Sequence, residues 1–185
     1  MQAGHWGLCV AGLVDRSAGV LRYSSTSACG TRRSWSSSRP SRVVFANDLD
    51  AAAVGEADGG TLALLQVGTG IAGRFVVDGD DAPVGHRPSA GEVGHLRFRD
   101  DGLPCSLRSA SGCAEAYGSW GPRPALPAAA EPSDLPPDVV AEAHQAIGFA
   151  AAALVATSDP GTLRIGGGLA AAWGETLSRP SPGES

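Results

Sequence analysis

Segments that predict β-strands alternate along this chain with segments that predict helices, and this order limits the fold more than any other feature. Residues 42–48, RVVFAND, predict a β-branched strand, and the Ala-rich run at 49–60 predicts a helix that glycines stop. Residues 137–159 predict the longest helix, with Pro137 near its start. Residues 161–177 predict a strand, a glycine turn and the start of another helix. Such alternation is typical of an α/β fold.

Two further pairs of strands are expected. Residues 7–15, GLCVAGLVD, predict one strand, and residues 19–23 predict a second strand across a turn. Residues 61–70 and 73–79 predict a β-hairpin whose strands are joined through a glycine turn at 68–73. No internal repeat accompanies these elements, so a repeat architecture is not expected.

The composition argues against several classes of protein. At 185 residues the chain allows one ordinary domain or two small ones. Its formal charge of −5 and its single Arg-rich run, which is also rich in Ser, argue against a nucleic-acid-binding surface. No apolar run is expected to reach the roughly 20 residues of a membrane span, and the N-terminus lacks the basic region of a signal peptide. The four cysteines lack disulfide-framework spacing, which predicts a protein of the reducing cytoplasm.

Asn47 and Asp48 lie where a predicted strand gives way to a predicted helix. Ligands bind at the carboxyl ends of strands in α/β proteins, so Asp48 is a candidate general base that takes a proton from a substrate hydroxyl. The alternative is that the aspartate only caps the helix that follows, because Asp and Asn are preferred N-cap residues. From these two residues alone, capping is the favoured interpretation.

Two glycine-rich turns follow predicted strands, GTGIAG at 68–73 and RIGGGLA at 164–170. Backbone N–H groups in such turns can approach phosphate oxygens closely. Neither turn matches the P-loop or the dinucleotide-binding fingerprint. Taken together, the two turns predict a nucleotide held between two glycine loops.

One short, glycine-punctuated segment combines a histidine, two cysteines and two glutamates. His95, Cys105 and Cys113 are three candidate zinc ligands, because zinc favours tetrahedral sites of Cys and His. A structural zinc site takes four protein ligands, so three would leave the site open or empty. Glu92 and Glu115 could accept hydrogen bonds from a polyhydroxylated ligand; the alternative is that both are solvated.

The ordered set of these motifs resembles the ROK family (repressor, open reading frame, kinase), which contains sugar kinases and sugar-responsive transcription regulators. The resemblance is discontinuous but covers most of the chain. It rests on CVAGLVDRSAGVLRY, ANDLDAAAVGE, VGTGIAGRFVVDG, AGEVGHLRFRDDGLPC, GCAEAY and AIGFAAAALVATSDPGTLRIGGG. It implies an actin-like ATPase fold of the ribonuclease-H type, with sugar bound in the cleft between two lobes.

The resemblance also implies roles for the candidate residues. Asp48 matches the family's catalytic base for the sugar hydroxyl. His95 matches a zinc ligand, with Cys105 and Cys113 as two of the family's three cysteines, so that zinc would hold the loop that carries sugar-binding side chains. The residues that match the family's sugar contacts are Asn47, Asp48, Glu92, His95 and Glu115.

The two glycine turns match the nucleotide side of the family's site, so the implied cofactors are ATP with Mg²⁺ in addition to zinc. Gly68, Thr69 and Gly70 match the second phosphate loop. The nucleotide-side loop is matched by Gly166, Gly167 and Gly168.

The chain also departs from the family pattern. The family's first phosphate loop, an Asp-Gly-Gly-Thr type of turn, is missing with most of the first lobe, and so is the helix-turn-helix of the regulator branch. Leu107 replaces the middle cysteine of C-x-C-G-x-x-G-C, and one residue is added before Cys113. A frameshift is one candidate cause. G/C-rich codons for residues 26–39, shifted by one base, can encode the family's Asn-Leu-Gly segment, and codons for residues 107–110 can encode Cys-Gly-Arg-Arg.

These observations divide the chain into a remnant of the first lobe at 1–58, a second lobe at 59–177 and a disordered tail at 178–185. The favoured function is an ATP-dependent kinase for a hexose such as glucose or an amino sugar, with homo-oligomers implied for the intact family and neither nucleic acid nor membrane as partner. The alternatives are the sugar-binding module of a regulator without its DNA-binding domain and an inactive frameshifted remnant. With the first phosphate loop missing, little or no phosphorylation is expected from this chain alone.

Overall fold

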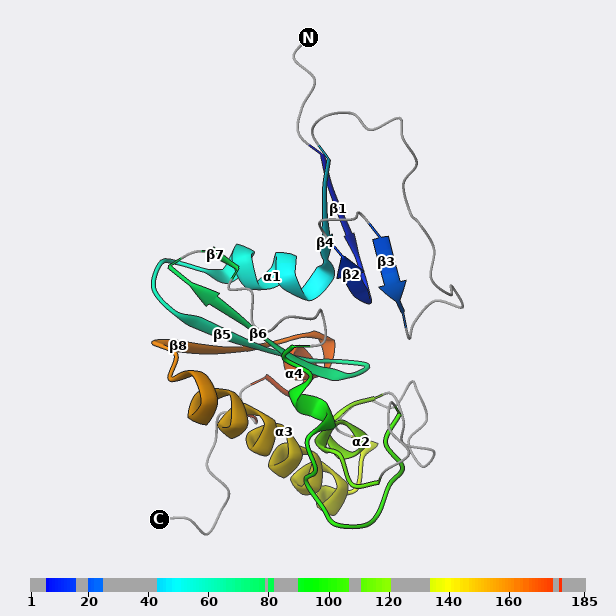
Figure 1. Ribbon diagram of the computed structural model, residues 1–185. Helices are drawn as coiled ribbons and strands as arrows, with labels where there is room; N and C mark the ends of the chain where they lie inside the picture. The colour runs from blue at the N-terminus through cyan, green and yellow to red at the C-terminus, as the bar shows by residue number, and fades with distance from the viewer. Residues whose placement is uncertain are drawn as a thin grey trace. The chain divides into compact units, whose positions relative to one another are not determined.

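The structure is a computed structural model, and it describes residues 6–15, 20–24, 43–78, 80–81, 90–106, 111–120, 134–174 and 177. The chain forms two compact units, one of Met1–Gly60 with Val76–Ala90 and the other of Thr61–Phe75 with Gly91–Ser185 (Figure 1). Strands alternate with helices in the described part of the chain, so the predicted α/β class is confirmed.

Several expectations fall on residues outside the described part of the chain. They concern the Arg-rich run at 31–42, the proposed frameshift segments at 26–39 and 107–110 and the tail at 178–185. These expectations stay predictions.

The strands of the first unit form two small sheets. β1 (Trp6–Val10) pairs in parallel with β4 (Val43–Asn47), while β2 (Leu13–Asp15) and β3 (Val20–Tyr23) are antiparallel. The N-terminal run that predicted a single strand therefore contains two, and that prediction was wrong. The break includes Gly12, whose φ of 133° is rarely open to residues with a side chain.

Helix α1 (Asp48–Glu56) follows β4 directly, as the sequence predicts. The side-chain oxygen of Asn47 accepts hydrogen bonds from the backbone N–H groups of Leu49 at 2.8 Å and Asp50 at 3.2 Å. These bonds satisfy N–H groups that have no partner within the helix. The N-cap residue is therefore Asn47, while Oδ1 of Asp48 accepts a further hydrogen bond from the N–H of Leu49 at 3.0 Å.

The second unit is built on neighbouring strands in the order β6 (Ile71–Val77), β5 (Leu62–Val67), β8 (Thr162–Gly166). The link between β5 and β6 is only three residues long, so these strands form the predicted hairpin through a tighter turn than expected. β5 and β8 run parallel, with Gln66 opposite Gly166. The glycine turns that follow β5 and β8 therefore leave the sheet at the same end.

Helix α3 (Pro137–Ser158) packs on β5 and on the short helix α2 (Ala114–Gly118), with proline in its first turn as predicted (Figure 1). Its buried residues recur at helical spacing: Ala143, Ala146, Ile147, Ala150 and Leu154. By length and composition α3 could cross a membrane, so the expectation that no segment reaches that length was wrong. One face of α3 packs against this unit, while most of its residues are partly or fully exposed.

We expect Leu154→Ala to lower the free energy of unfolding by about 3 kcal/mol, because the removed side chain leaves a cavity in a packed core. Leu154 is fully buried, and an added Cβ on Gly73 of β6 would lie 2.6 Å from its Cδ2. Urea denaturation measures the change. Val155→Ala, at a neighbouring position that is 42% exposed, is the matched control and should change stability by less than about 0.5 kcal/mol. Equal effects would contradict the packing described.

Candidate functional site

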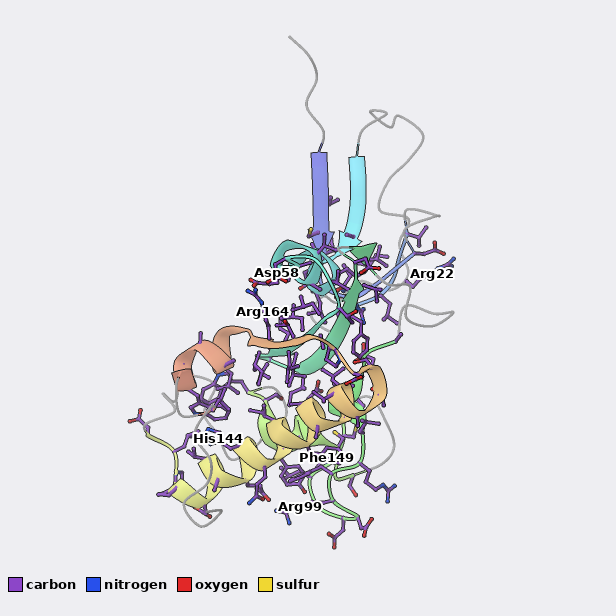
Figure 2. The ribbon with its side chains drawn as sticks, turned by 90° about the vertical axis from the view of Figure 1, so that its left-hand side faces the viewer. Arg22, Asp58, Arg99, His144, Phe149 and Arg164 are labelled. Carbon is purple, nitrogen blue, oxygen red and sulfur yellow. The ribbon has the colours of Figure 1, made fainter. Side chains whose placement is uncertain are left out.

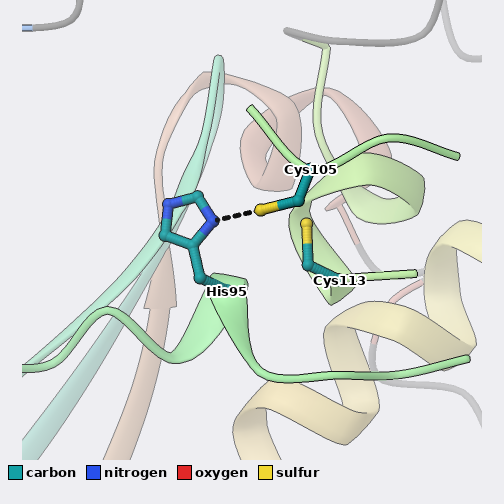
Figure 3. Close-up of side chains that lie close together, drawn as sticks. All are labelled: His95, Cys105 and Cys113. Carbon is teal, nitrogen blue, oxygen red and sulfur yellow. Dashed lines mark hydrogen bonds between the residues drawn. The ribbon is translucent and has the colours of Figure 1, made fainter. Parts of the chain in front are cut away.

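The three candidate zinc ligands come together in the second unit. His95 ends the short helix η1 (Val93–His95), and Cys113 immediately precedes α2. The Sγ atom of Cys105 lies 3.4 Å from Nδ1 of His95 (Figure 3). One potential ligand atom from each residue lies within 4.8 Å of the other two, and all three residues are buried.

The backbone around the cluster is held by close contacts with β6. The N–H of Gly73 donates to the carbonyl of Gly91 at 2.7 Å, and an added Cβ on Gly94 would lie 2.8 Å from Cβ of Ile71. These glycines let the segment that carries Glu92 and His95 lie directly against the strand.

The cysteine side of the cluster is closed by a second set of backbone contacts. The N–H groups of Phe98 and Arg99 both donate to the carbonyl of Gly112, at 2.7 and 2.9 Å. Arg97 forms a β-bridge with Cys113. Gly112 has a φ of 79°, a conformation that favours glycine. These contacts hold Cys113 beside the segment that follows His95.

The donor set fits zinc. Two ligands of a tetrahedral zinc ion, one imidazole nitrogen and one thiolate sulfur, lie about 3.5 Å apart, close to the Cys105–His95 separation. Burial, and then the hydrogen bond with Cys105, raise the pKa of Cys113 to about 11. A zinc ion bound here would have to displace thiol protons, so its affinity would fall as the pH falls.

The opposite edge of the His95 ring faces two carboxylates. Its Nε2 lies 3.7 Å from Oε2 of Glu92 and 3.9 Å from Oε1 of Glu115. Burial raises the pKa of Glu92, and the nearby His95 and Arg74 oppose the rise. A metal on Nδ1 would leave the ring proton on Nε2, where it can be donated to an oxygen atom. The Glu115 side chain is only 12% exposed, so the solvated alternative does not describe it.

The two glycine turns are neighbours. An added Cβ on Gly68 would lie 3.9 Å from the backbone nitrogen of Gly168. Gly167, with φ of 101°, precedes helix α4 (Gly168–Trp173). Both turns lie at the carboxyl ends of parallel strands, which is the usual position of ligand sites in α/β sheets.

Asn47 and Asp48 belong to the first unit. The Asn47 amide donates to the carbonyl of Gly12 at 2.7 Å as well as capping α1, so both of its polar atoms are engaged within the protein. Asp48 is exposed at the first helical position. The convergence of Asp48 with Glu92 and Glu115 on one sugar stays a prediction.

The sequence did not single out several residues that support the cluster. The hydroxyl of Tyr117 accepts a hydrogen bond from the N–H of Leu103 at 3.0 Å. The Arg99 guanidinium lies over the Phe98 and Tyr117 rings and pairs with Glu142 of α3 at 2.8 Å (Figure 2). These contacts pin the loop to α3. The sequence signal that could have identified these residues is the presence of aromatic and charged side chains beside the segment with the candidate metal ligands.

His144 gives a pH-dependent prediction. It lies on α3, packs edge-on against Trp173 with ring centroids 4.9 Å apart, and its buried Nε2 has no hydrogen-bond partner among the described residues (Figure 2). Burial lowers its pKa below the ordinary 6.5. The unfolded chain therefore binds the proton more readily, and stability is lost as the pH falls from 6.5 through the lower folded pKa.

We expect His144→Phe to reduce the loss of stability between about pH 7.5 and about pH 5.5, since the variant keeps a ring beside Trp173 but cannot be protonated. Urea midpoints for both proteins across that range provide the measurement. Identical pH profiles would show that His144 does not contribute.

Comparisons with known proteins agree with this architecture. Residues 2–176 match the sequence model of the ROK family. The chain belongs to the ROK family. It is 39% identical to the glucokinase of Streptomyces coelicolor over 83 residues, which are 42% of this chain and 26% of the glucokinase. The ROK chain thus matches about a quarter of this curated relative's length.

Two solved ROK structures resemble most of the chain. The ROK hexokinase from Thermus thermophilus has a TM-score of 0.73 and 27% identity, over 94% of this chain and 65% of the hexokinase. A ROK family transcriptional regulator, a homolog of the E. coli MLC protein, has a TM-score of 0.72 and 20% identity, over 94% of this chain and 51% of the regulator. The chain therefore has part of the actin-like ATPase fold of ROK sugar kinases.

Proposed function

We propose that this chain supplies the sugar-binding half of a ROK hexose kinase, and that the hexose is glucose or a close relative. The observation that carries the proposal is the convergence of Glu92, His95 and Glu115 in one unit. Two carboxylates and an imidazole N–H together offer acceptors and a donor, which suits the adjacent hydroxyls of a sugar. The similarity to a glucokinase and a hexokinase supports a hexose as substrate.

The other candidate residues take parts in the same proposal. Asp48 would accept the proton of the sugar hydroxyl that attacks ATP, and the paired glycine turns would hold phosphate oxygens beside Mg²⁺. Zinc held by His95, Cys105 and Cys113 would supply a structural cross-link rather than redox or acid–base chemistry. The complete protein would act in the cytoplasm as a homo-oligomer.

A sugar sensor is the second candidate, because the regulator structure has nearly the same TM-score to this chain as the hexokinase, although its identity is lower. Both functions need the cluster around His95. Only the kinase needs a base at Asp48, so that residue separates the two functions.

Glucose titration by calorimetry tests the sugar site. We expect a dissociation constant on the order of 1 mM, because the family's Asn-Leu-Gly contact is not in the sequence. Glu115→Gln should weaken binding about tenfold or more, through loss of an ionised acceptor. Asp138→Asn, which changes an exposed carboxylate in the first turn of α3, is the control and should not weaken binding.

The absence of binding heat at glucose concentrations up to about ten times that dissociation constant would contradict the proposed sugar site.

A coupled ATP assay tests the kinase activity. We expect turnover well below about 1 per second. Asp48→Asn should remove whatever turnover exists, and turnover that persists in Asp48→Asn would contradict the assigned base.

A further inference from the structure

The Glu115 carboxylate is held by one group at the start of β6 and one group beside Cys105. Its Oε2 accepts a hydrogen bond from the N–H of Ile71 at 3.0 Å, directly after the glycine turn. Its Oε1 accepts one from the hydroxyl of Ser106 at 2.7 Å. An added Cβ on Gly70 would lie 2.7 Å from Oε2, so the glycine leaves the space that the carboxylate occupies.

The helix that carries Glu115 is also tied to the glycine turn at its other end. The N–H of Trp120 donates to the carbonyl of Gly68 at 3.0 Å, and the hydroxyl of Ser119 donates to the carbonyl of Glu115 at 2.8 Å. A movement of this short helix would therefore displace the backbone at both ends of the glycine turn, at Gly68 and at Ile71.

Ser106 is the contact that links this arrangement to the metal cluster. It follows Cys105 directly in the chain, and its hydroxyl bonds to the Glu115 oxygen that lies 3.9 Å from Nε2 of His95. The Ser106 side chain is exposed, so its hydroxyl is not needed to fill the core. A hydrogen bond to an ionised carboxylate is stronger than one between neutral groups.

The geometry points to Ser106 as a positioning residue for Glu115. Through the Ser106 hydroxyl, the loop that carries Cys105 sets the orientation of the Glu115 carboxylate. This carboxylate faces the proposed sugar site and accepts a hydrogen bond at the end of the glycine turn. The expected effect on sugar binding rests on the proposed function, in which Glu115 contacts the sugar. Ser106 is not one of the proposed sugar contacts or candidate metal ligands.

The test compares Ser106→Ala with Ser106→Thr, which keeps a hydroxyl, in the whole 185-residue chain loaded with zinc. Ser106→Ala should weaken glucose binding about tenfold and Ser106→Thr should restore it to within about threefold of the parent. Ser106→Ala should also speed hydrogen exchange of the Ile71 amide about tenfold, measured by NMR without sugar. Zinc per chain should stay unchanged in both variants. Ser111→Ala, on the same loop, is the control and should alter neither measurement.

The exchange measurement separates this inference from the proposed function. If the parent binds no glucose but Ile71 exchange rises in Ser106→Ala and recovers in Ser106→Thr, the positioning of Glu115 is supported and the sugar site is not. If Ile71 exchange and glucose binding are both unchanged in Ser106→Ala, the inference is overturned. Loss of zinc in Ser106→Ala would also overturn it, since the serine would then hold the loop as a whole.

Discussion

Zinc affinity is expected to fall at least about a hundredfold in Cys113→Ala. Structural zinc sites with four ligands bind with roughly 10–16 kcal/mol, so one ligand is worth about 3 kcal/mol, or two orders of magnitude. Cys113 is 2% exposed, and its sulfur belongs to the three-residue cluster. Elemental analysis gives zinc per chain, and competition with a chromophoric chelator gives the affinity.

Cys9→Ala is the matched control, because Cys9 is an exposed free thiol in the first unit. It removes the same chemical group without touching the cluster, so zinc affinity should not change. Zinc that binds equally well to Cys113→Ala and to the parent would show that the metal, if bound, lies elsewhere in the chain.

The second large effect is expected from restoring the family's cysteine spacing. Between Cys105 and Cys113 the chain has one residue more than C-x-C-G-x-x-G-C and lacks its middle cysteine. Replacing residues 106–112 with the six-residue family pattern adds a fourth thiolate at the family's distance from its neighbours. Zinc affinity should then rise about a hundredfold, because both ligand number and tetrahedral geometry are restored.

The control for this replacement has the same length but carries serine in place of the new cysteine. It corrects the spacing and leaves the ligand number at three, so most of the gain should disappear. Tight stoichiometric zinc in the unaltered chain would show that the altered spacing is tolerated. Failure of the replaced loop to bind zinc would show that this segment is not a metal loop in this protein.

Local features of the fold could be predicted because local chemistry decides them. Pro137 is favoured in the first turn of a helix, and α3 begins there. Gly59 and Gly60 follow the helix α1 that they were predicted to stop, and both have positive φ. The N-terminal strand break was missed because a lone glycine between apolar residues is also found inside strands.

The candidate site could be predicted only in part. Family motifs assigned His95, Cys105 and Cys113 to one metal, and the structure brings them together. The bonds from Glu115 to Ser106 and Ile71 depend on how a helix and two loops pack, and no spacing rule encodes that packing. Likewise, only the observed side-chain bonds assign the cap of α1 to Asn47 instead of Asp48.

The contact between Gly70 and Glu115 has a consequence for how this sequence can evolve. The carboxylate occupies the volume that any side chain at position 70 would need, with only 2.7 Å between its Oε2 and an added Cβ. Alanine at position 70 would force the Glu115 carboxylate to shift and so disturb its hydrogen bond with the N–H of Ile71. The two positions should therefore change together among relatives, with glycine retained wherever the glutamate is retained, although they are far apart in the chain.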